Sequence, residues 1–281
     1  MPSLLILSVL PLFGLDVVVS AQYPEEYGSA VFCPNNFVEG LDTDSEVYTS
    51  SWTCAYVHWL LCDYYSYYHS SSFWHELYIG DNRTNPVDPE DYSYVLSFLQ
   101  QWCDKVVFFS KGHCTPWGSI GRHRQLLCSL SDEGNNYQAK DSIHIFPYTD
   151  QYKCRFAFIW HCGTINSHSP PWLDQDGPVS MPLAFTHNVG MARNGNSGSC
   201  IFLGFSWASP QFTSKISYQN PDKNWWYCHF AYLFFENLSY GDSVWEAIND
   251  VCYSIYGCYY QNSPIYDSLW VLGNRDMTLE F

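Results

Sequence analysis

Two short apolar segments of the sequence each lead to a histidine followed by a cysteine, a pair of side chains that can perform nucleophilic catalysis. The first segment leads to His113 and Cys114, and the second leads to His161 and Cys162. A thiolate is a strong nucleophile, and a neighbouring imidazole can take the thiol proton before the sulfur attacks a carbonyl carbon. The sequence therefore indicates Cys162 as a candidate nucleophile and His113 as its candidate general base.

Backbone and loop groups near these residues complete this hypothesis. Amides at Cys114 and Gly163 are candidates to stabilise the oxyanion that forms after the attack. Gly163 also allows a sharp turn and a close approach of the substrate backbone. Asp174 and Asp176 follow in the next loop, where a carboxylate would select substrates with Arg or Lys at the cleaved bond. Ordinary solvated loop carboxylates are the alternative interpretation of these two residues.

The apolar segments are themselves the elements that must position this chemistry. Residues 105–110 and 156–161 are β-branched or aromatic runs, typical of fully buried strands in a parallel sheet. Chemistry in open α/β sheets takes place just outside the carboxyl ends of such strands, so both segments would deliver their last residues to one edge. Further strands are predicted over 201–205 and 268–272, and helices over 51–65, 91–103, 225–238 and 242–253. This alternation predicts an α/β domain with a mostly parallel sheet.

The N-terminus carries a segment unlike the rest of the chain. Residues 4–13 are apolar, and Val19 and Ala21 stand at the small-residue positions before a cleavage site, the pattern of a secretory signal peptide, although no Lys or Arg precedes the apolar run. We expect a signal peptide over 1–21, an extended lead-in over 22–50 and one domain over 51–281. No later segment is long and apolar enough to span a membrane. A secreted or cell-surface protein is therefore expected, and an uncleaved N-terminal anchor is the alternative.

Composition and charge exclude some partners. The 281 residues include 28 Asp and Glu against 12 Lys and Arg, a formal net charge of −16. Such a charge repels nucleic acid and anionic membrane surfaces, so neither is expected as a partner. Hydrophobic residues make up 47% of the chain, and aromatic residues reach 19%, enough for a large core and for an aromatic binding surface as well. No cofactor is expected, and the oligomeric state is not indicated.

The cysteines and the glycosylation motifs fit an exported chain. All 12 cysteines follow the expected signal, and export favours disulfide bonds. If Cys162 is a free nucleophile, an odd number remains, so a second cysteine is also unpaired or binds a metal, and Cys114 is the first candidate. Sequons at Asn82 and Asn237 fit a glycoprotein. His58 and Cys62 have metal-ligand spacing on one helical face, but without a second pair nearby a packed aromatic helix is favoured.

The order of these motifs resembles the caspase, gingipain and legumain superfamily of cysteine peptidases. In that superfamily a histidine follows one apolar strand and a cysteine followed by glycine ends the next, as 110–113 and 162–163 do here. Residues 234–249 resemble the helix start of gingipain-type domains, and residues 272–279 stand where that group often has a Gly-Asp-Pro strand. The resemblance covers about residues 90–281. It implies a caspase-like α/β fold, with a mostly parallel sheet flanked by helices in a three-layer sandwich.

The resemblance implies an exported cysteine endopeptidase that acts on a protein or peptide substrate, with His113 and Cys162 as its dyad. Three features depart from the family pattern: Cys114 replaces the glycine after the histidine, His161 replaces a small residue before the cysteine, and the final strand lacks the Asp-Pro. The alternative is a non-catalytic caspase-like extracellular binding or structural protein, with the dyad residues structural or bound to zinc. Adjacent strand residues face opposite sides, so these two His-Cys pairs are not expected to converge on a metal. A disulfide between Cys114 and Cys162 is a third alternative.

Overall fold

The structure is a computed structural model, and it describes most of the chain from residue 26 onward. The described residues are 26–34, 43–68, 74–79, 87, 89–115, 125–130, 137–150, 152–165, 179–188, 190–216 and 224–279. The expected signal peptide over 1–21 and the sequon at Asn82 lie outside them. Among the described helices, none combines the length and the apolar character needed to cross a membrane.

A six-stranded sheet forms the centre of the fold, in the order β11-β8-β7-β3-β1-β2. Its strands in chain order are β1 (Tyr27–Phe32), β2 (Trp74–Ile79), β3 (Lys105–Lys111), β7 (Cys154–Trp160), β8 (Ile201–Phe205) and β11 (Leu269–Gly273). The pairs β1–β2, β1–β3, β3–β7 and β7–β8 are parallel, and only β11 runs antiparallel to its neighbour β8. The predicted strands at 105–110, 156–161, 201–205 and 268–272 are therefore confirmed, with ends shifted by up to two residues.

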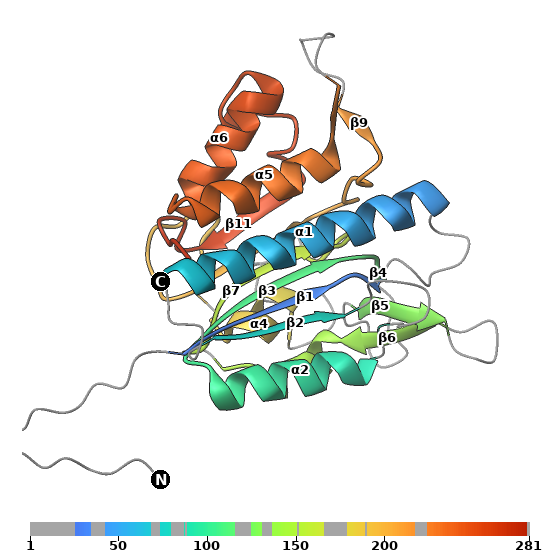
Figure 1. Cartoon of the computed structure of the whole chain (residues 1–281), viewed down its shortest axis with the longest axis vertical. Coiled ribbons are helices and arrows are strands. Elements are labelled where there is room, and N and C mark those ends of the chain that lie inside the picture. The colour runs from blue at the N-terminus through green and yellow to red at the C-terminus, as the bar shows by residue number, and fades with distance from the viewer. Residues whose placement is uncertain are drawn as a thin grey trace, which may run out of the picture.

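Helices cover both faces of this sheet (Figure 1). One face carries α1 (Asp44–Tyr68), α5 (Tyr227–Ser239) and α6 (Val244–Tyr256), and the other carries α2 (Pro89–Trp102), α3 (Ser142–Ile145) and α4 (Met181–Thr186). Along β3 the side chains alternate between the two cores, because successive residues of a strand point to opposite faces. Val107 and Phe109 face α1 and α5, whereas Val106 and Phe108 face α2 and α4. The predicted α/β fold class, a mostly parallel sheet between two helical layers, is confirmed.

Strand β1 corrects the expected domain boundary. Residues 22–50 were expected to form an extended lead-in, but Tyr27–Phe32 is a fully buried strand between β2 and β3, and α1 already begins at Asp44. The middle of β1 reads Gly-Ser-Ala, which lacks the branched and aromatic residues that identify a buried strand. The described part of the domain therefore begins with β1, well before residue 51.

The remaining elements are short. Strands β4 (Cys114–Thr115), β5 (Gln125–Leu130) and β6 (Tyr137–Asp141) form a second sheet, and β9 (Lys215–Ile216) pairs with β10 (Trp225–Trp226). In the described part of the chain, 3-10 turns occupy Phe146–Tyr148 and Tyr260–Asn262. Helix α6 begins after Ser243, two residues later than the predicted start at residue 242. The Ser243 hydroxyl accepts a hydrogen bond from the Glu246 amide, while the Glu246 carboxylate accepts one from the Ser243 amide.

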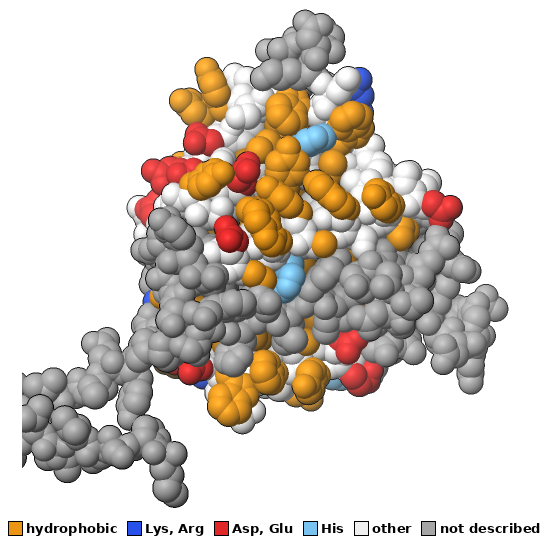
Figure 2. Space-filling view, viewed as in Figure 1, with side chains coloured by type: hydrophobic (Ala, Val, Ile, Leu, Met, Phe, Trp, Pro, Cys, Tyr) orange, Lys and Arg blue, Asp and Glu red, His pale blue; other side chains and the backbone are white. Residues whose placement is uncertain are grey.

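Aromatic residues divide between the interior and one outer face. Trp52, Tyr56 and Trp59 of α1 form a row of ring contacts that continues to Tyr232 of α5. Trp52 and Trp59 are more than half exposed. Figure 2 shows hydrophobic side chains gathered on the face that α1 and α5 form. The high aromatic content therefore builds both the core and an aromatic surface.

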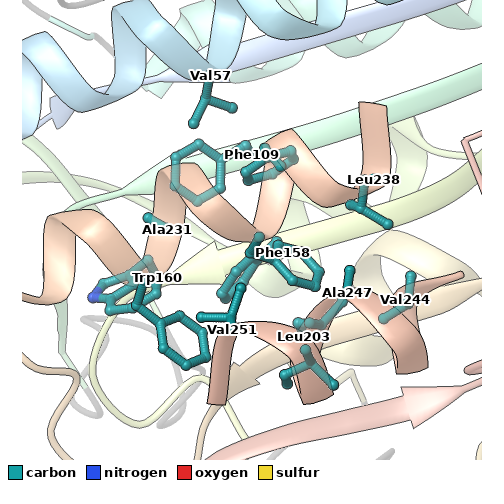
Figure 3. Close-up of a cluster of buried hydrophobic side chains, with 14 of the residues drawn as sticks. Val57, Phe109, Phe158, Trp160, Leu203, Ala231, Leu238, Val244, Ala247 and Val251 are labelled. Atoms are coloured by element: carbon teal, nitrogen blue, oxygen red, sulfur yellow. The ribbon is translucent and has the colours of Figure 1, made fainter. Parts of the chain in front are cut away.

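The larger core is a cluster of aromatic rings between the sheet and helices α1, α5 and α6 (Figure 3). Phe158 lies at its centre and is fully buried. Its ring centroid is 5.6 Å from that of Phe109, 5.5 Å from that of Trp160 and 5.5 Å from that of Phe234. These rings come from two neighbouring strands and from α5, so the cluster fixes the helical layer against the part of the sheet that carries both His-Cys segments.

We expect Phe158→Ala to lower the free energy of unfolding by about 3–5 kcal/mol, because it removes a buried ring and leaves a cavity. Urea unfolding followed by circular dichroism measures the change. Tyr94→Ala is the control, since that side chain is 67% exposed and its loss is expected to cost no more than about 0.5 kcal/mol. Equal losses in the two variants would contradict the central role of Phe158.

Candidate active site

The structure brings His113 and Cys162 together at the carboxyl edge of the sheet. Strands β3 and β7 are parallel neighbours, and the last residue of each, Lys111 and Trp160, stand opposite one another. His113 follows β3 by two residues and Cys162 follows β7 by two residues. Equal offsets from paired strand ends place the two side chains side by side, and the His113 side chain hydrogen-bonds the Cys162 sulfur.

Ser209, from the loop after β8, also contacts the Cys162 thiol. Its amide donates a hydrogen bond to the sulfur at 3.2 Å, and its hydroxyl oxygen lies 3.4 Å from the sulfur. Burial alone would raise the pKa of the Cys162 thiol, but the hydrogen bonds from His113 and Ser209 outweigh it and lower that pKa to about 7. A large fraction of Cys162 is therefore thiolate at neutral pH, which is the reactive form of a cysteine.

His161 lies in the interior and holds the backbone of His113. Its Nδ1 is 2.6 Å from the His113 carbonyl oxygen, and its Nε2 is 2.8 Å from the Ser110 hydroxyl. The Ser110 hydroxyl is in turn 3.2 Å from the hydroxyl of Tyr92. Burial lowers the pKa of His161 to about 3, although its bond to the His113 carbonyl opposes that shift, so the ring is neutral.

These distances fix the direction of each hydrogen bond in the chain. A carbonyl oxygen can only accept a hydrogen bond, so Nδ1 of His161 carries the single ring proton and donates a hydrogen bond to the carbonyl oxygen of His113. The other ring nitrogen then accepts from Ser110, whose oxygen accepts from Tyr92. His161 therefore does not crowd the Cys162 thiol, and both of its nitrogens are occupied, which removes it from the zinc set considered above.

Gly112 makes this arrangement sterically feasible. A methyl group at this position would lie 2.6 Å from Cγ of Pro34 and 2.7 Å from Cε1 of His161. Both contacts are far inside van der Waals distance, so any larger residue would displace the His161 ring. Gly112 therefore leaves room for the His161 ring, which holds the backbone of His113.

The expected oxyanion role of Gly163 needs correction. Gly163 has a φ of 58°, in the left-handed region that favours glycine, and this allows the sharp turn that was predicted. Its amide, however, donates to the carbonyl of Trp207 at 2.7 Å, and the amide of Ile165 donates to Phe205 at 3.0 Å. Because backbone pairing continues past the end of β8, the Gly163 amide is occupied by the protein. The Cys114 backbone lies in β4, opposite Leu126 of β5.

The loop carboxylates, the disulfide, the metal site and the second sequon were also considered from the sequence. Asp174 and Asp176 lie outside the described residues. Cys162 is a thiol, which contradicts the alternative of a disulfide between it and Cys114. Within the described part of the chain, no group of three or more His, Cys, Asp and Glu side chains is arranged to hold a metal ion. Asn237 of the second sequon lies half-buried in α5.

Sequence reasoning missed the residues that support the dyad. Ser209 lies 47 positions from Cys162, and Ser110 lies 51 positions from His161, so no local pattern connects either pair. A weak signal exists for Ser110, because a hydroxyl inside a buried strand must find a hydrogen-bond partner. No comparable signal marks Ser209.

Comparisons with known proteins give a structural similarity but no sequence match. No protein-family model matches the chain, and the comparison with curated proteins found no match. Among solved structures, the chain is similar to caspase-1 from Spodoptera frugiperda, with 9% sequence identity, a TM-score of 0.42 and coverage of 90% of each chain.

We expect Cys162 to react with iodoacetamide with a pH midpoint near 7, and His113→Ala to move that midpoint upward. The variant loses a hydrogen bond that lowers the thiol pKa, so the thiolate fraction at neutral pH falls. Alkylation rates between pH 5 and 9, measured by mass spectrometry on the Cys162 peptide, give both midpoints. Cys258→Ser is the control, and a midpoint unchanged by His113→Ala would contradict the contact.

We also expect His161 to make the fold sensitive to acid. Its pKa is about 3 when folded and about 6.5 when unfolded, so only the unfolded chain takes up this proton as the pH falls below 6.5. The stability from the neutral ring is fully present above pH 6.5 and is lost toward pH 3, by up to about 1.4 kcal/mol per pH unit. Urea unfolding measures the free energy of unfolding of wild type and of His161→Gln at each pH. The difference between the two should become smaller from pH 6.5 toward pH 3, and a constant difference would contradict a buried neutral His161.

Proposed function

We propose that this chain is a cysteine endopeptidase in which Cys162 is the nucleophile and His113 is the general base. The observation that carries this proposal is the hydrogen bond between the two side chains at the carboxyl edge of the sheet, with the thiol pKa lowered to about 7. A buried structural cysteine ordinarily has a raised pKa, as Cys154 and Cys252 do here. Cys162 differs from them because two hydrogen-bonding residues converge on its sulfur.

The proposed reaction begins with transfer of the Cys162 proton to His113. The thiolate adds to the carbonyl carbon of a peptide bond, and the carbonyl oxygen becomes an oxyanion. His113 then gives its proton to the leaving amine, and the bond from carbon to nitrogen breaks to leave a thioester on Cys162. Water, losing a proton to His113, hydrolyses the thioester, releases the acid and regenerates the thiol.

In this mechanism a backbone amide beside the thiol stabilises the oxyanion. We place this role on the amide of Cys162, because the Gly163 amide already donates to Trp207 and Cys114 stands in β4, paired with β5. Ser209 acts earlier in the reaction, since its donors face the sulfur rather than a substrate oxygen. Its bonds favour the thiolate before attack and weaken as negative charge moves to the substrate.

The wider setting of the enzyme is part of the same proposal. The order of the histidine and cysteine segments resembles that of the caspase, gingipain and legumain superfamily, whose members are cysteine peptidases. An apolar N-terminal segment over 4–13 supports export, to the cell surface or beyond. Asp174 and Asp176 support a preference for Arg or Lys at the cleaved bond.

We expect the purified chain to cleave a peptide library, and Cys162→Ala to abolish the cleavage. His113→Ala should lower the rate by a factor of about 10²–10⁴, the usual contribution of a general base. Mass spectrometry of the products gives both the rate and the residue before the cut. Cys114→Ser is the matched control, because it changes the neighbouring thiol but leaves the His113 contact in place.

Cleavage that survives Cys162→Ala would contradict the assignment of the nucleophile. A wild-type chain that binds library peptides without cleaving them, and whose Cys162 is nevertheless reactive, would favour the alternative, a non-catalytic binding protein on the same fold.

A further inference from the structure

A buried ion pair lies directly behind the candidate dyad. Glu46, in the first turn of α1, places Oε1 3.2 Å from Nζ of Lys111, the last residue of β3. The two side chains are 0% and 2% exposed. A buried ion pair is seldom more stable than two well-packed apolar side chains of the same volume, because removing both charges from water is costly. The position of the pair therefore calls for an explanation other than stability.

The Glu46 carboxylate also holds the loop between β8 and β9, residues 206–214. It accepts hydrogen bonds from the Phe212 amide, the Thr213 amide and the Thr213 hydroxyl, each at 2.7 Å. The hydroxyl of Ser50, one turn further along α1, adds a fourth bond at 3.3 Å. Burial raises the pKa of Glu46, but Lys111 and these donors outweigh it and lower the pKa overall, so the group is ionised.

The two groups that contact the Cys162 sulfur both depend on chain segments that end at this carboxylate. His113 lies two residues after Lys111, and Ser209 lies three residues before Phe212. The loop has a further attachment between them, where Nε1 of the Trp160 indole donates to the carbonyl of Pro210 at 2.8 Å. One carboxylate therefore connects α1, the end of β3 and the loop that carries Ser209.

We infer that Glu46 is a positioning residue for the Cys162 site, holding His113 through Lys111 and Ser209 through the β8–β9 loop. This inference rests on the proposed function, because it concerns the activation of the same thiol. Without the Glu46 carboxylate, the β8–β9 loop and the end of β3 would lose the group that both of them bind. His113 and Ser209 would then no longer both contact the Cys162 sulfur.

Two thiols also lie near Glu46, those of Cys54 and Cys228. Burial raises the pKa of both, so they stay neutral over most of the range from pH 5 to 9. Lys111 is the charged partner, and Glu46 with Lys111 forms a pair of zero net charge. Beside Cys162 itself stand His113 and Ser209, with His161 neutral behind them. A change in the Cys162 profile between pH 5 and 9 therefore reports on His113 and Ser209.

The test is the pH profile of Cys162 alkylation in the double variant Glu46→Gln with Lys111→Met. This variant removes both charges at once, so neither charge is left buried and unpaired. We expect the midpoint to rise from about 7 toward the ordinary value of about 8.5, with the rate at pH 7 falling about tenfold. Ser50→Ala is the matched control, because it removes one hydroxyl from the same carboxylate without touching the loop, and its midpoint should stay near that of wild type.

A double variant that melts at a lower temperature but keeps the wild-type midpoint would overturn the inference and leave Glu46 a purely structural role. If the double variant does not fold, Thr213→Val decides the question, since it removes a hydroxyl from the same carboxylate on the loop side. A raised midpoint in Thr213→Val but not in Ser50→Ala supports positioning, and equal midpoints overturn it.

The same data separate this inference from the proposed function. A low wild-type midpoint that rises in the variants, in a chain that cleaves no peptide, rejects the peptidase and retains the positioning role. A wild-type midpoint already near 8.5 rejects both.

Discussion

Strands β3 and β7 lie in the middle of the sheet with helices on both faces, so the side chains that lead to the two strand ends are shielded from solvent. Residues 106–111 and 156–160 are all buried. Chemistry that involves water or a substrate can begin only where these strands end. Every polar group near those ends must then find its partner inside the protein, because water does not reach it.

The polar groups at the strand ends meet this requirement in two separate ways. Ser110 and His161 belong to a neutral chain in which each donor has one acceptor, ending at the His113 carbonyl. Lys111 and Glu46 instead form a charged cluster that also takes up the amides of the β8–β9 loop. Successive residues of β3 point to opposite faces, so the neutral chain and the charged cluster lie on opposite sides of the same strand. Together they fix the backbone of β3 just before His113.

The sequence predicts the sheet and the candidate dyad better than it predicts the residues that hold the dyad in place. Apolar runs identify β3, β7, β8 and β11, and the topology of a parallel sheet places His113 beside Cys162. Strand β1 was missed because its centre is made of small residues, and its burial comes from packing that no local pattern contains. The occupied amide of Gly163 depends on a loop more than 40 residues away. The roles of Ser209 and Glu46 could not be predicted from the sequence for the same reason, since they arise only when α1 and the β8–β9 loop meet at the end of the sheet.

Hydrogen-bond direction in the Tyr92–Ser110–His161 chain confines proton transfer to one imidazole. His113 and His161 are joined through the backbone carbonyl of the first, and two such rings would ordinarily compete for a proton taken from the thiol. His161 cannot take it, because its only available nitrogen already accepts from Ser110 and its other nitrogen donates to a carbonyl. In the proposed mechanism, a proton that leaves Cys162 would therefore stay on the His113 ring, where it is available to the leaving group, and would not pass to His161 in the interior of the protein.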